Sequence, residues 1–278
     1  MQLDSDKLEK IIAAALEEDI GNGDITSELT IGDNQHLSAD FVARENCVVA
    51  GIPVLEQLFS REGGKITFEP RSLEGKEIKN GDIIFSVSGN ARVILAFERV
   101  ALNLLQYACG IATVTRKFAN EVKHTKAKIL DTRKTTPNLR LLARYAVWIG
   151  GGRNHRFCLD DGILIKDNHI ALVGDIEKII SMAKSGTPEG MKVEVECDNL
   201  EQVEKAIAAG ADIILLDNMD IEMLKKAVAM NNGKCLLEAS GGVNLKTVKA
   251  IAETGVDRIS VGAITHSAPA VDIGLDIK

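Results

Sequence analysis

The segment AIAAGADIILLDN at residues 206–218 carries a helical pattern that stops at a glycine and runs on into an apolar strand. The same succession returns as AIAETGVDRISVGA at residues 250–263, with Gly210 and Gly255 at matching positions. Glycine readily adopts the left-handed conformation in which many helices end. The repeat therefore predicts a helix–strand unit that the fold uses more than once.

Short apolar runs predict six strands after residue 127, with amphipathic helical stretches between them. The runs are KILDT, GILIKD, KVEVEC, DIILLD, KCLLEAS and DRISVG. Strands that alternate with helices build a parallel sheet, which is either open or closed into a barrel. Polar residues end or follow these strands, and they are Thr132, Arg133, Lys134, Lys166, Glu196, Asp217, Ser240 and Gly262. Because barrel enzymes gather their active sites at the C-terminal strand ends, we predict an α/β fold, an incomplete TIM-like barrel with fewer than eight regular strands.

The first 110 residues have a different pattern, which predicts a separate α+β domain. A helix is expected at about 5 to 18, and strands near 37–50, 65–70 and 82–88. The mostly apolar segment ARVILAFERVALNLLQYACG at 91–110 predicts a helix that leads into the barrel. We therefore divide the chain into an N-terminal domain of residues 1–110 and a barrel of residues 111–266, and expect residues 267–278 to return to the first domain.

The composition indicates a globular protein that acts on small molecules. The 278 residues are 45% hydrophobic, enough for a sizeable core, and a formal net charge of -7 argues against general nucleic-acid binding. Five scattered cysteines without a C-x-x-C pair argue against a disulfide framework or a zinc site. The acidic N-terminus lacks a signal-peptide pattern, and no apolar run approaches the roughly 20 residues that a bilayer requires. We expect a cytoplasmic protein that does not enter a membrane.

Residues 132–159, TRKTTPNLRLLARYAVWIGGGRNHRFCL, carry six Arg and Lys residues and a His but no Asp or Glu. The cations are mixed with glycines and apolar residues, which favours fixed positions around a small anion over a merely solvated basic face. Arg133 suits bidentate carboxylate or phosphate binding, and Lys134 acts as a compact point charge. His155 and Arg156 in GGGRNHR add a donor and a second guanidinium, although a lone histidine is often purely structural.

Lys166 ends the buried-strand pattern GILIK, so it must reach solvent, pair with an acid or meet a ligand. A barrel lysine can also form a Schiff base, and a lyase or aldolase that uses Lys134 or Lys166 is one alternative function. The sequence supplies many anion contacts but no group dedicated to imine chemistry. An anion-binding role is therefore favoured.

Three carboxylates follow in the next two strands. Glu194 and Glu196 in VEVE face the same side of one strand, and Asp217 in LLDN ends the next. A sparse pair of carboxylates facing a basic pocket is typical of a magnesium ion bound with a phosphate substrate. The alternative is that these acids pair with Lys134 and Lys166.

Two small-residue turns follow the last strands. They are Ser240, Gly241 and Gly242 in EASGG, and Val261, Gly262 and Ala263 in SVGA. Barrels often bind phosphate at late loops of this kind, although glycine also simply tightens turns. Arg99 is the remaining candidate, a lone arginine in an apolar helix that either binds a ligand or pairs with Glu98.

Taken together, these motifs resemble the quinolinate phosphoribosyltransferase family, and they do so over nearly the whole chain. The segments are FERVALN, DTRKTTPNLR, GGGRNHRFCLDDGILIKDNH, VEVE, LLDN, EASGG and SVGA. The resemblance implies an N-terminal sandwich-like domain, an incomplete barrel, and a dimer or a multiple of dimers. It also implies a reaction of quinolinate with phosphoribosyl pyrophosphate that yields nicotinate mononucleotide, pyrophosphate and CO2, with Mg²⁺ and without an organic cofactor.

The resemblance also implies roles for single residues. Arg133, His155 and Arg156 would grip the two quinolinate carboxylates. Lys134 and Lys166 would span quinolinate and the phosphoribosyl donor. Thr135 would complete the TRKT contact, and Glu196 and Asp217 would serve the metal and the ribose hydroxyls. The turns Ser240 to Gly242 and Val261 to Ala263 would bind the 5-phosphate. Arg99 would reach the site of a neighbouring subunit.

The nearest rival within this fold is a molybdenum-associated relative that acts on another substrate. Retention of both NHR and TRKT favours quinolinate. A barrel that only binds an anionic metabolite would be expected to lose the metal carboxylates, whereas Glu196 and Asp217 are both present. Trp148, Ile149 and Cys158 depart from the family pattern and indicate differences in packing near the pocket.

Overall fold

The computed structural model describes residues 3–278, and its chain divides into two compact units. The first comprises the residues up to Arg116 together with Thr135–Gly151 and Thr265–Lys278, and the second comprises Lys117–Lys134 and Gly152–Ile264. The sequence-based division assigned 135–151 to the barrel, but their helix α5 (Arg140–Ile149), which is buried from Leu141 to Val147, belongs to the first unit. The boundary at residue 110 stays a prediction.

The first unit is built on a four-stranded antiparallel sheet with the order β12-β1-β5-β3. Its strands are β1 (His36–Ala43), β3 (Ile66–Pro70), β5 (Ile83–Asn90) and β12 (Ile273–Ile277). A small pair joins β2 (Cys47–Val48) and β4 (Glu77–Ile78). The helices are α1 (Ser5–Ile20), α2 (Ile25–Thr30), α3 (Ile52–Ser60), α5 and most of α4 (Ala91–Val122). These elements confirm the mixed α and β content that the sequence predicted for this region.

Aromatic side chains form the centre of the first unit. Phe41 of β1 stacks on Phe85 of β5 with ring centroids 4.0 Å apart, and Phe59 of α3 meets Phe41 edge-on. All three are fully buried. At the N-terminus the side chain of Asp4 accepts the N–H of Lys7 at 3.1 Å and so caps α1.

The 32-residue helix α4 is long and apolar enough, by length and composition alone, to cross a membrane. This corrects the sequence-based expectation that no apolar run approaches that length. In the structure, 61% of the apolar window is buried against other parts of the protein. The core helix of a globular protein can meet the same criterion of length and composition. Its residues are apolar because they pack on neighbouring elements.

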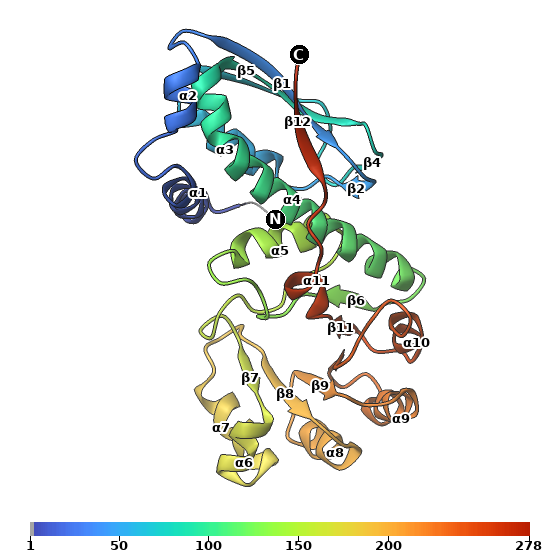
Figure 1. Cartoon of the computed structure of the whole chain (residues 1–278). Coiled ribbons are helices and arrows are strands. Elements are labelled where there is room, and N and C mark those ends of the chain that lie inside the picture. Colours follow the sequence, from blue (N-terminus) through green and yellow to red (C-terminus); the bar gives the residue numbers. More distant parts are fainter. Residues whose placement is uncertain (1–2) are drawn as a thin grey trace. The chain divides into compact units, whose positions relative to one another are not determined.

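The second unit contains a six-stranded parallel sheet with the order β6-β11-β10-β9-β8-β7 (Figure 1). The strands are β6 (Lys128–Leu130), β7 (Ile163–Ile165), β8 (Val193–Cys197), β9 (Ile213–Asp217), β10 (Leu236–Ser240) and β11 (Arg258–Ser260). All six predicted strands are confirmed. A single parallel bridge from Leu130 to Arg153 extends the sheet beyond β6. Within residues 3–278, β6 and β7 do not pair, so the barrel is incomplete as predicted.

Helices connect the strands of the second unit. They are α6 (Asp167–Val173), α7 (Ile176–Gly186), α8 (Leu200–Ala208), α9 (Ile221–Asn231) and α10 (Val248–Glu253), followed by the short α11 (Ala263–His266). In Figure 1, α8, α9 and α10 lie on the outer side of the strands. The side chains of Asp175, Asn199 and Asp220 accept main-chain N–H groups and cap α7, α8 and α9.

The sequence repeat has a structural counterpart at the strand starts. Asp212 accepts the N–H of Val193 through its side chain at 2.8 Å, and its own N–H donates to the Val193 carbonyl. Asp257, its repeat partner, holds Leu237 in the same way, with a side-chain distance of 2.9 Å. Gly210 and Gly255 have φ angles of +75° and +95°, as predicted for the helix ends. Each copy of the sequence repeat therefore fixes the register of the neighbouring strand.

Candidate active site

The predicted polar residues of the barrel lie at the C-terminal ends of its parallel strands. Arg133 and Lys134 follow β6, Lys166 follows β7, and Asp217 ends β9. Glu196 is one residue from the end of β8. Since neighbouring parallel strands end at the same edge of a sheet, the second unit carries these charges at one mouth, where barrel enzymes perform their chemistry.

Three carboxylates form what we call the outer cluster, Glu196, Asp198 and Asp217. Their ligand oxygens all lie within 4.8 Å of one another. Lys166 Nζ lies 3.5 Å from Glu196 Oε2, so the ion pair that the sequence left as an alternative is present. Burial, together with the charge of Asp217, nevertheless raises the pKa of Glu196 in spite of Lys166. A carboxylate set of this kind suits a hard divalent cation.

Two guanidinium groups of the second unit influence each other's charge. Arg156 is half-buried and donates to the carbonyl of Gly162 at 2.8 Å. Burial lowers the pKa of Arg156, and the positive charge of Arg133 lowers it further. An anion bound by both arginines would offset this repulsion, and each guanidinium can bind a carboxylate through two N–H groups.

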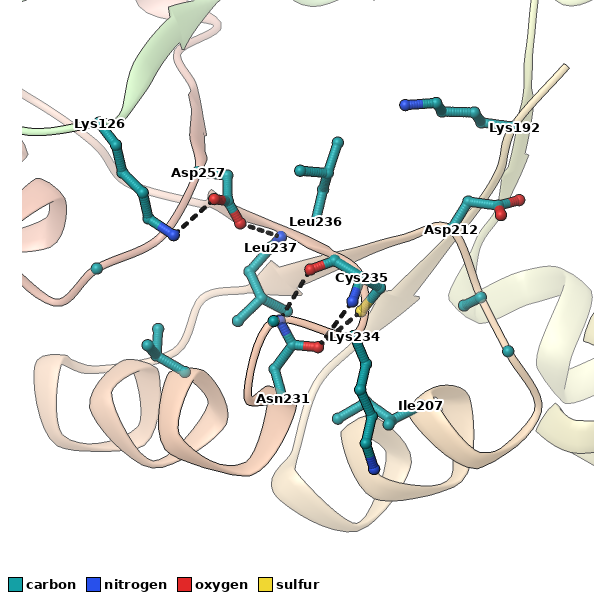
Figure 2. A pocket seen from close by; sticks show the side chains of 15 residues that line it. Lys126, Lys192, Ile207, Asp212, Asn231, Lys234, Cys235, Leu236, Leu237 and Asp257 are labelled. Carbon is teal, nitrogen blue, oxygen red and sulfur yellow. Dashed lines mark hydrogen bonds and ion pairs between the residues drawn. The ribbon is translucent and has the colours of Figure 1, made fainter. Parts of the chain in front are cut away.

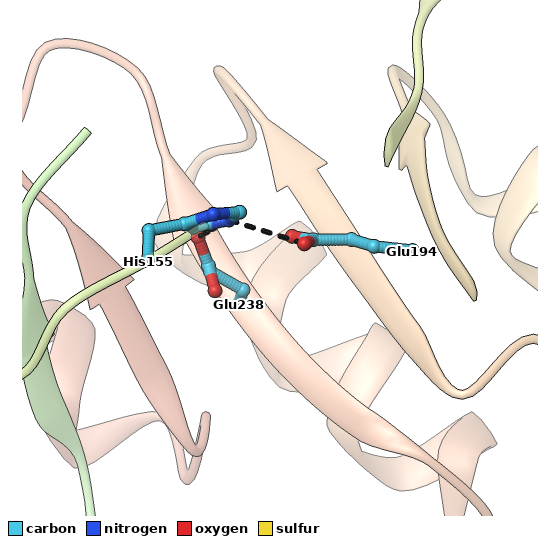
Figure 3. Close-up of side chains that lie close together, drawn as sticks. All are labelled: His155, Glu194 and Glu238. Atoms are coloured by element: carbon cyan, nitrogen blue, oxygen red, sulfur yellow. Dashed lines mark ion pairs between the residues drawn. The ribbon is translucent and has the colours of Figure 1, made fainter. Parts of the chain in front are cut away.

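A second cluster, the inner cluster, comprises His155, Glu194 and Glu238 (Figure 3). His155 Nε2 lies 3.1 Å from Glu194 Oε2 and 3.5 Å from Glu238 Oε1. The two carboxylates are 3% and 0% exposed, so they lie inside the barrel rather than at its mouth. Glu194 therefore does not join Glu196 in the outer cluster, although both point to the same side of β8.

The hydrogen bonds of the inner cluster define the state of the histidine ring. His155 Nδ1 accepts the main-chain N–H of Arg156 at 2.7 Å, which leaves Nε2 to carry the proton toward Glu194. Burial opposes a charge on His155, but Glu194 and Glu238 outweigh this effect and raise its pKa. Burial and the nearby charge of Glu194 raise the pKa of Glu238 to about 7. The ring acts here as a hydrogen-bond link between the barrel interior and the NHR segment.

The late loops are shaped by glycines. Gly241 has a φ of +95°, and a Cβ atom there would lie 2.1 Å from Asn218 Oδ1. Asn218 in turn donates to Asp217 Oδ2 at 2.6 Å. After β11, the N–H of Val261 donates to the carbonyl of Leu130 at 3.0 Å, and Ala263 begins α11. These are the two predicted phosphate loops, and both follow strands that end at the mouth.

Two predicted site residues belong to the first unit. Thr135 accepts a hydrogen bond from Arg140 Nε at 3.0 Å through its hydroxyl. Arg99 is exposed on α4, and within residues 3–278 it takes part in no ion pair, so the alternative of pairing with Glu98 is not observed. Neither observation excludes a role in the site, so Thr135 and Arg99 both remain candidates.

A hollow of about 480 Å³ lies at the opposite ends of the barrel strands (Figure 2). Lys126 pairs there with Asp257 at 2.7 Å, and Asn231 donates to the carbonyl of Cys235 at 2.8 Å. Its acids are the ones that fix the strand starts, Asp212 and Asp257. In barrel proteins this end serves stability rather than catalysis, so we place the chemistry at the mouth.

Comparison with known families settles the relationship of the chain. The model of the quinolinate phosphoribosyl transferase C-terminal domain matches residues 111–276, and that of the N-terminal domain matches residues 24–109. The chain belongs to the quinolinate phosphoribosyl transferase family.

Named relatives agree with this family across the full length. A probable nicotinate-nucleotide pyrophosphorylase [carboxylating] of Bacillus subtilis is 40% identical over 271 residues, which covers 98% of this chain and 93% of the relative. The nicotinate-nucleotide pyrophosphorylase [carboxylating] of Mycobacterium leprae is 41% identical and covers 96% and 95%. The crystal structure of the nicotinate-nucleotide pyrophosphorylase from Ehrlichia chaffeensis has a TM-score of 0.95 at 45% identity, with both chains fully covered.

In this family member, sequence reasoning missed several residues that the structure brings into the site. Asp198 joins the outer cluster, although it lies just past β8, the strand predicted from KVEVEC. Glu238 had a visible signal, because a charge inside the apolar run KCLLEAS must be paired if it is buried. Asp131 lies directly before the TRKT motif and is fully buried. It accepts the N–H of His155 at 2.7 Å, a contact across 24 positions that no local pattern reveals.

Proposed function

We propose that this phosphoribosyltransferase transfers a phosphoribosyl group from phosphoribosyl pyrophosphate to the nitrogen of quinolinate. The products are nicotinate mononucleotide, pyrophosphate and CO2. The observation that carries the proposal is the group of charges at the C-terminal strand ends, where Arg133 and Lys134 follow β6 and Lys166 pairs with Glu196 of β8. A pyridine with two adjacent carboxylates presents the paired negative charge that such an arrangement binds best.

We assign the anion contacts from the same arrangement. Arg133 and Arg156 hold the carboxylates of quinolinate. The contact that the family implies for His155 is made through Arg156, because His155 Nδ1 accepts the Arg156 N–H and Nε2 faces Glu194. Lys134 is exposed beside Arg133, and the exposed part of Lys166 reaches the outer cluster. Two mobile ammonium groups between an acidic acceptor and a pyrophosphate donor favour the approach of two anions that would otherwise repel each other.

The outer cluster is our candidate for Mg²⁺. Its donors are all carboxylate oxygens within 4.8 Å of one another, and one or two of them, with waters and phosphate oxygens, suit this ion. Glu196 and Asp217 would hold it, with Asp198 as an added ligand. Bound Mg²⁺ would neutralise charge on pyrophosphate as it leaves. We propose no organic cofactor.

The chemistry needs little beyond positioning. As the bond between ribose and pyrophosphate breaks, positive charge develops on the sugar, and the quinolinate nitrogen forms the new bond to that carbon. The ring is then cationic and accepts the electron pair of the adjacent carbon–carboxylate bond, which releases CO2. A proton from water completes the product. The carboxylates near the sugar, Glu196 and Asp217, stabilise the developing charge.

We further propose that the two late loops, at Ser240 to Gly242 and at Val261 to Ala263, bind the 5-phosphate through their main-chain N–H groups. Thr135 completes the contacts of the TRKT segment. We also propose a homodimer, or a multiple of dimers, in which the exposed Arg99 reaches the site of the neighbouring subunit. The cytoplasm is the proposed location.

The decisive experiment is an assay with quinolinate, phosphoribosyl pyrophosphate and Mg²⁺ that follows nicotinate mononucleotide and CO2. Nicotinate serves as the comparison substrate, since it lacks the carboxylate that is lost. Product from quinolinate alone supports the proposal. Turnover of nicotinate at an equal rate, or no turnover by folded protein, would contradict it.

The shared site is tested by mixing two inactive variants, Arg99→Ala and Lys134→Ala. If Arg99 works in the neighbouring site, mixed dimers contain one site with both native side chains, and up to about a quarter of the sites recover. Light scattering reports the oligomeric state of each variant. Absence of recovery in proteins that exchange subunits would exclude the assignment of Arg99.

A further inference from the structure

The NHR segment has no helix or strand of its own to hold it. Apart from the single bridge at Arg153, residues 154–158 lie outside regular structure. Asp131 holds its main chain by accepting the N–H of His155 at 2.7 Å and the side-chain amide of Asn154 at 2.6 Å. The placement of the Arg156 side chain therefore depends on contacts made by its neighbours.

The His155 ring ties this segment to two strands of the barrel. It points between Glu194 of β8 and Glu238 of β10 (Figure 3), and β9 separates these strands in the sheet. On its other side, Nδ1 accepts the N–H of Arg156 at 2.7 Å. The Ser260 hydroxyl donates to Glu238 and orients it. The His155 ring thus links the main chain of Arg156 to β8 and β10.

The two carboxylates are expensive to bury if stability is their only purpose. Glu194 Oε1 and Glu238 Oε2 are buried, and among residues 3–278 neither accepts a hydrogen bond. Buried acids without full pairing reduce stability relative to apolar residues of the same size. Such a loss of stability inside a barrel has a physical reason where the acids fix a group that must be accurately placed.

We propose that Glu194 and Glu238 are positioning residues, which hold the proton of His155 on Nε2 so that Nδ1 fixes the main chain at Arg156. This inference rests on the proposed function, because it explains how the carboxylate-binding arginine is placed. The pair acts through His155 and touches no reacting atom. Loss of the pair should weaken quinolinate binding and leave binding of the phosphoribosyl donor intact.

The test compares Glu194→Met with Glu194→Gln. Both remove the charge and keep the length of the side chain, but only glutamine keeps an oxygen that accepts from Nε2. We expect Glu194→Met to raise the KM for quinolinate roughly 10- to 100-fold, the scale of a small misplacement of a binding group. The KM for phosphoribosyl pyrophosphate should stay unchanged, and Glu194→Gln should restore most of the affinity.

A matched control is Asp257→Asn, which alters a carboxylate at the start of a neighbouring strand without touching His155. It should change the melting temperature but not the KM for quinolinate. If Glu194→Met does not fold, Ser260→Ala removes the donor that orients Glu238 and should raise the KM for quinolinate about three- to tenfold. Equal rises in both KM values, or none in Glu194→Met and Ser260→Ala alike, would overturn the proposal.

A spectroscopic measurement separates this proposal from the proposed function. Side-chain ¹⁵N signals of the histidines, with His155 assigned by the His155→Asn variant, report which ring nitrogen carries the proton. We expect the neutral ring with its proton on Nε2 in the wild type and an altered, broadened signal in Glu194→Met. A proton on Nδ1 in the wild type would refute the proposal even if the enzyme is active, because Nδ1 could not then accept the Arg156 N–H. If quinolinate is not converted, this measurement still tests whether Glu194 and Glu238 position the His155 ring.

Discussion

The inner and outer clusters place the same residue type two positions apart on one strand, yet they serve different ends. Glu194 and Glu196 both point to the same side of β8, but their side chains are 5% and 12% exposed, and their partners differ. Glu194 meets a mostly buried histidine, whereas Glu196 meets a half-exposed lysine and two further acids. Depth along the strand therefore separates a carboxylate that positions another side chain from one that can bind a ligand.

The two clusters differ more in access than in charge balance. Burial, together with the charge of Asp217, raises the pKa of Glu196 in spite of Lys166, so a cation could offset charge in the outer cluster. Burial and the charge of Glu194 raise the pKa of Glu238 to about 7 in spite of His155, the Ser260 hydroxyl and Arg258, which lies 3.9 Å away. The outer acids can be reached by a ligand, whereas the inner acids are closed off by burial.

The largest effect is expected from removing the outer charges. The double variant Glu196→Gln and Asp217→Asn should lower kcat about 100- to 1,000-fold, because these groups face the charge that develops in the transition state. Steady-state kinetics over a range of Mg²⁺ concentrations measures this loss. The melting temperature should stay near that of the wild type. Nearly full activity would mean that the outer cluster is only a surface ion-pair network.

The inner cluster should show the opposite balance between activity and stability. Glu238→Ala leaves the buried Ser260 hydroxyl without its acceptor and removes one of the two carboxylates beside His155, and it should lower the free energy of unfolding by about 3 kcal/mol. Glu196→Ala should change it by less than about 1 kcal/mol, because Lys166 can turn to solvent. Urea unfolding of both variants makes the comparison. Equal losses would remove the distinction between the clusters.

A glycine behind the outer cluster gives a smaller effect. Gly241→Ala forces a side chain into a φ of +95° and against Asn218, which orients Asp217. We expect a cost of roughly 1–3 kcal/mol in stability and a higher KM for phosphoribosyl pyrophosphate. Gly242→Ala is the control, since nothing lies within 4 Å of its Cβ position and its φ of +60° is less demanding. Its effects on stability and KM should be smaller, and the reverse order would show that Asn218 has no such role.

The smallest effect concerns pH. The folded protein keeps a proton on Glu238 up to a pKa of about 7, whereas the unfolded chain releases it near the ordinary value of 4.5. The free energy of unfolding contributed by this group therefore falls as the pH rises between these values. His155, Glu194, Ser260 and Arg258 are the charged and polar groups that face it. Glu238→Gln should gain stability relative to the wild type between about pH 5 and pH 8. A constant difference in urea unfolding would contradict the raised pKa.

Much of the outer site was predictable because it depends on local order along the chain. Short strands separated by helices define a parallel sheet, and in such a sheet the residue that ends each strand must lie at the common mouth. This reasoning placed Lys166, Glu196 and Asp217 correctly at strand ends. The same alternation showed that Glu194 and Glu196 share a face. It did not show how deep each lies, and so it grouped Glu194 with the metal candidates.

The sequence by itself determined the parallel helix–strand series, the incomplete barrel and the basic segment, since each follows from the spacing of neighbouring residues. Only the tertiary structure decided that His155 turns to Glu194 and Glu238, that Asp131 holds the NHR segment, and that Asp198 joins the outer cluster. Apart from the near neighbours Glu196 and Asp198, these contacts join residues 19 to 83 positions apart, and their strength depends on burial. Periodicity records which face a side chain takes, whereas depth and partner are set by how the strands pack.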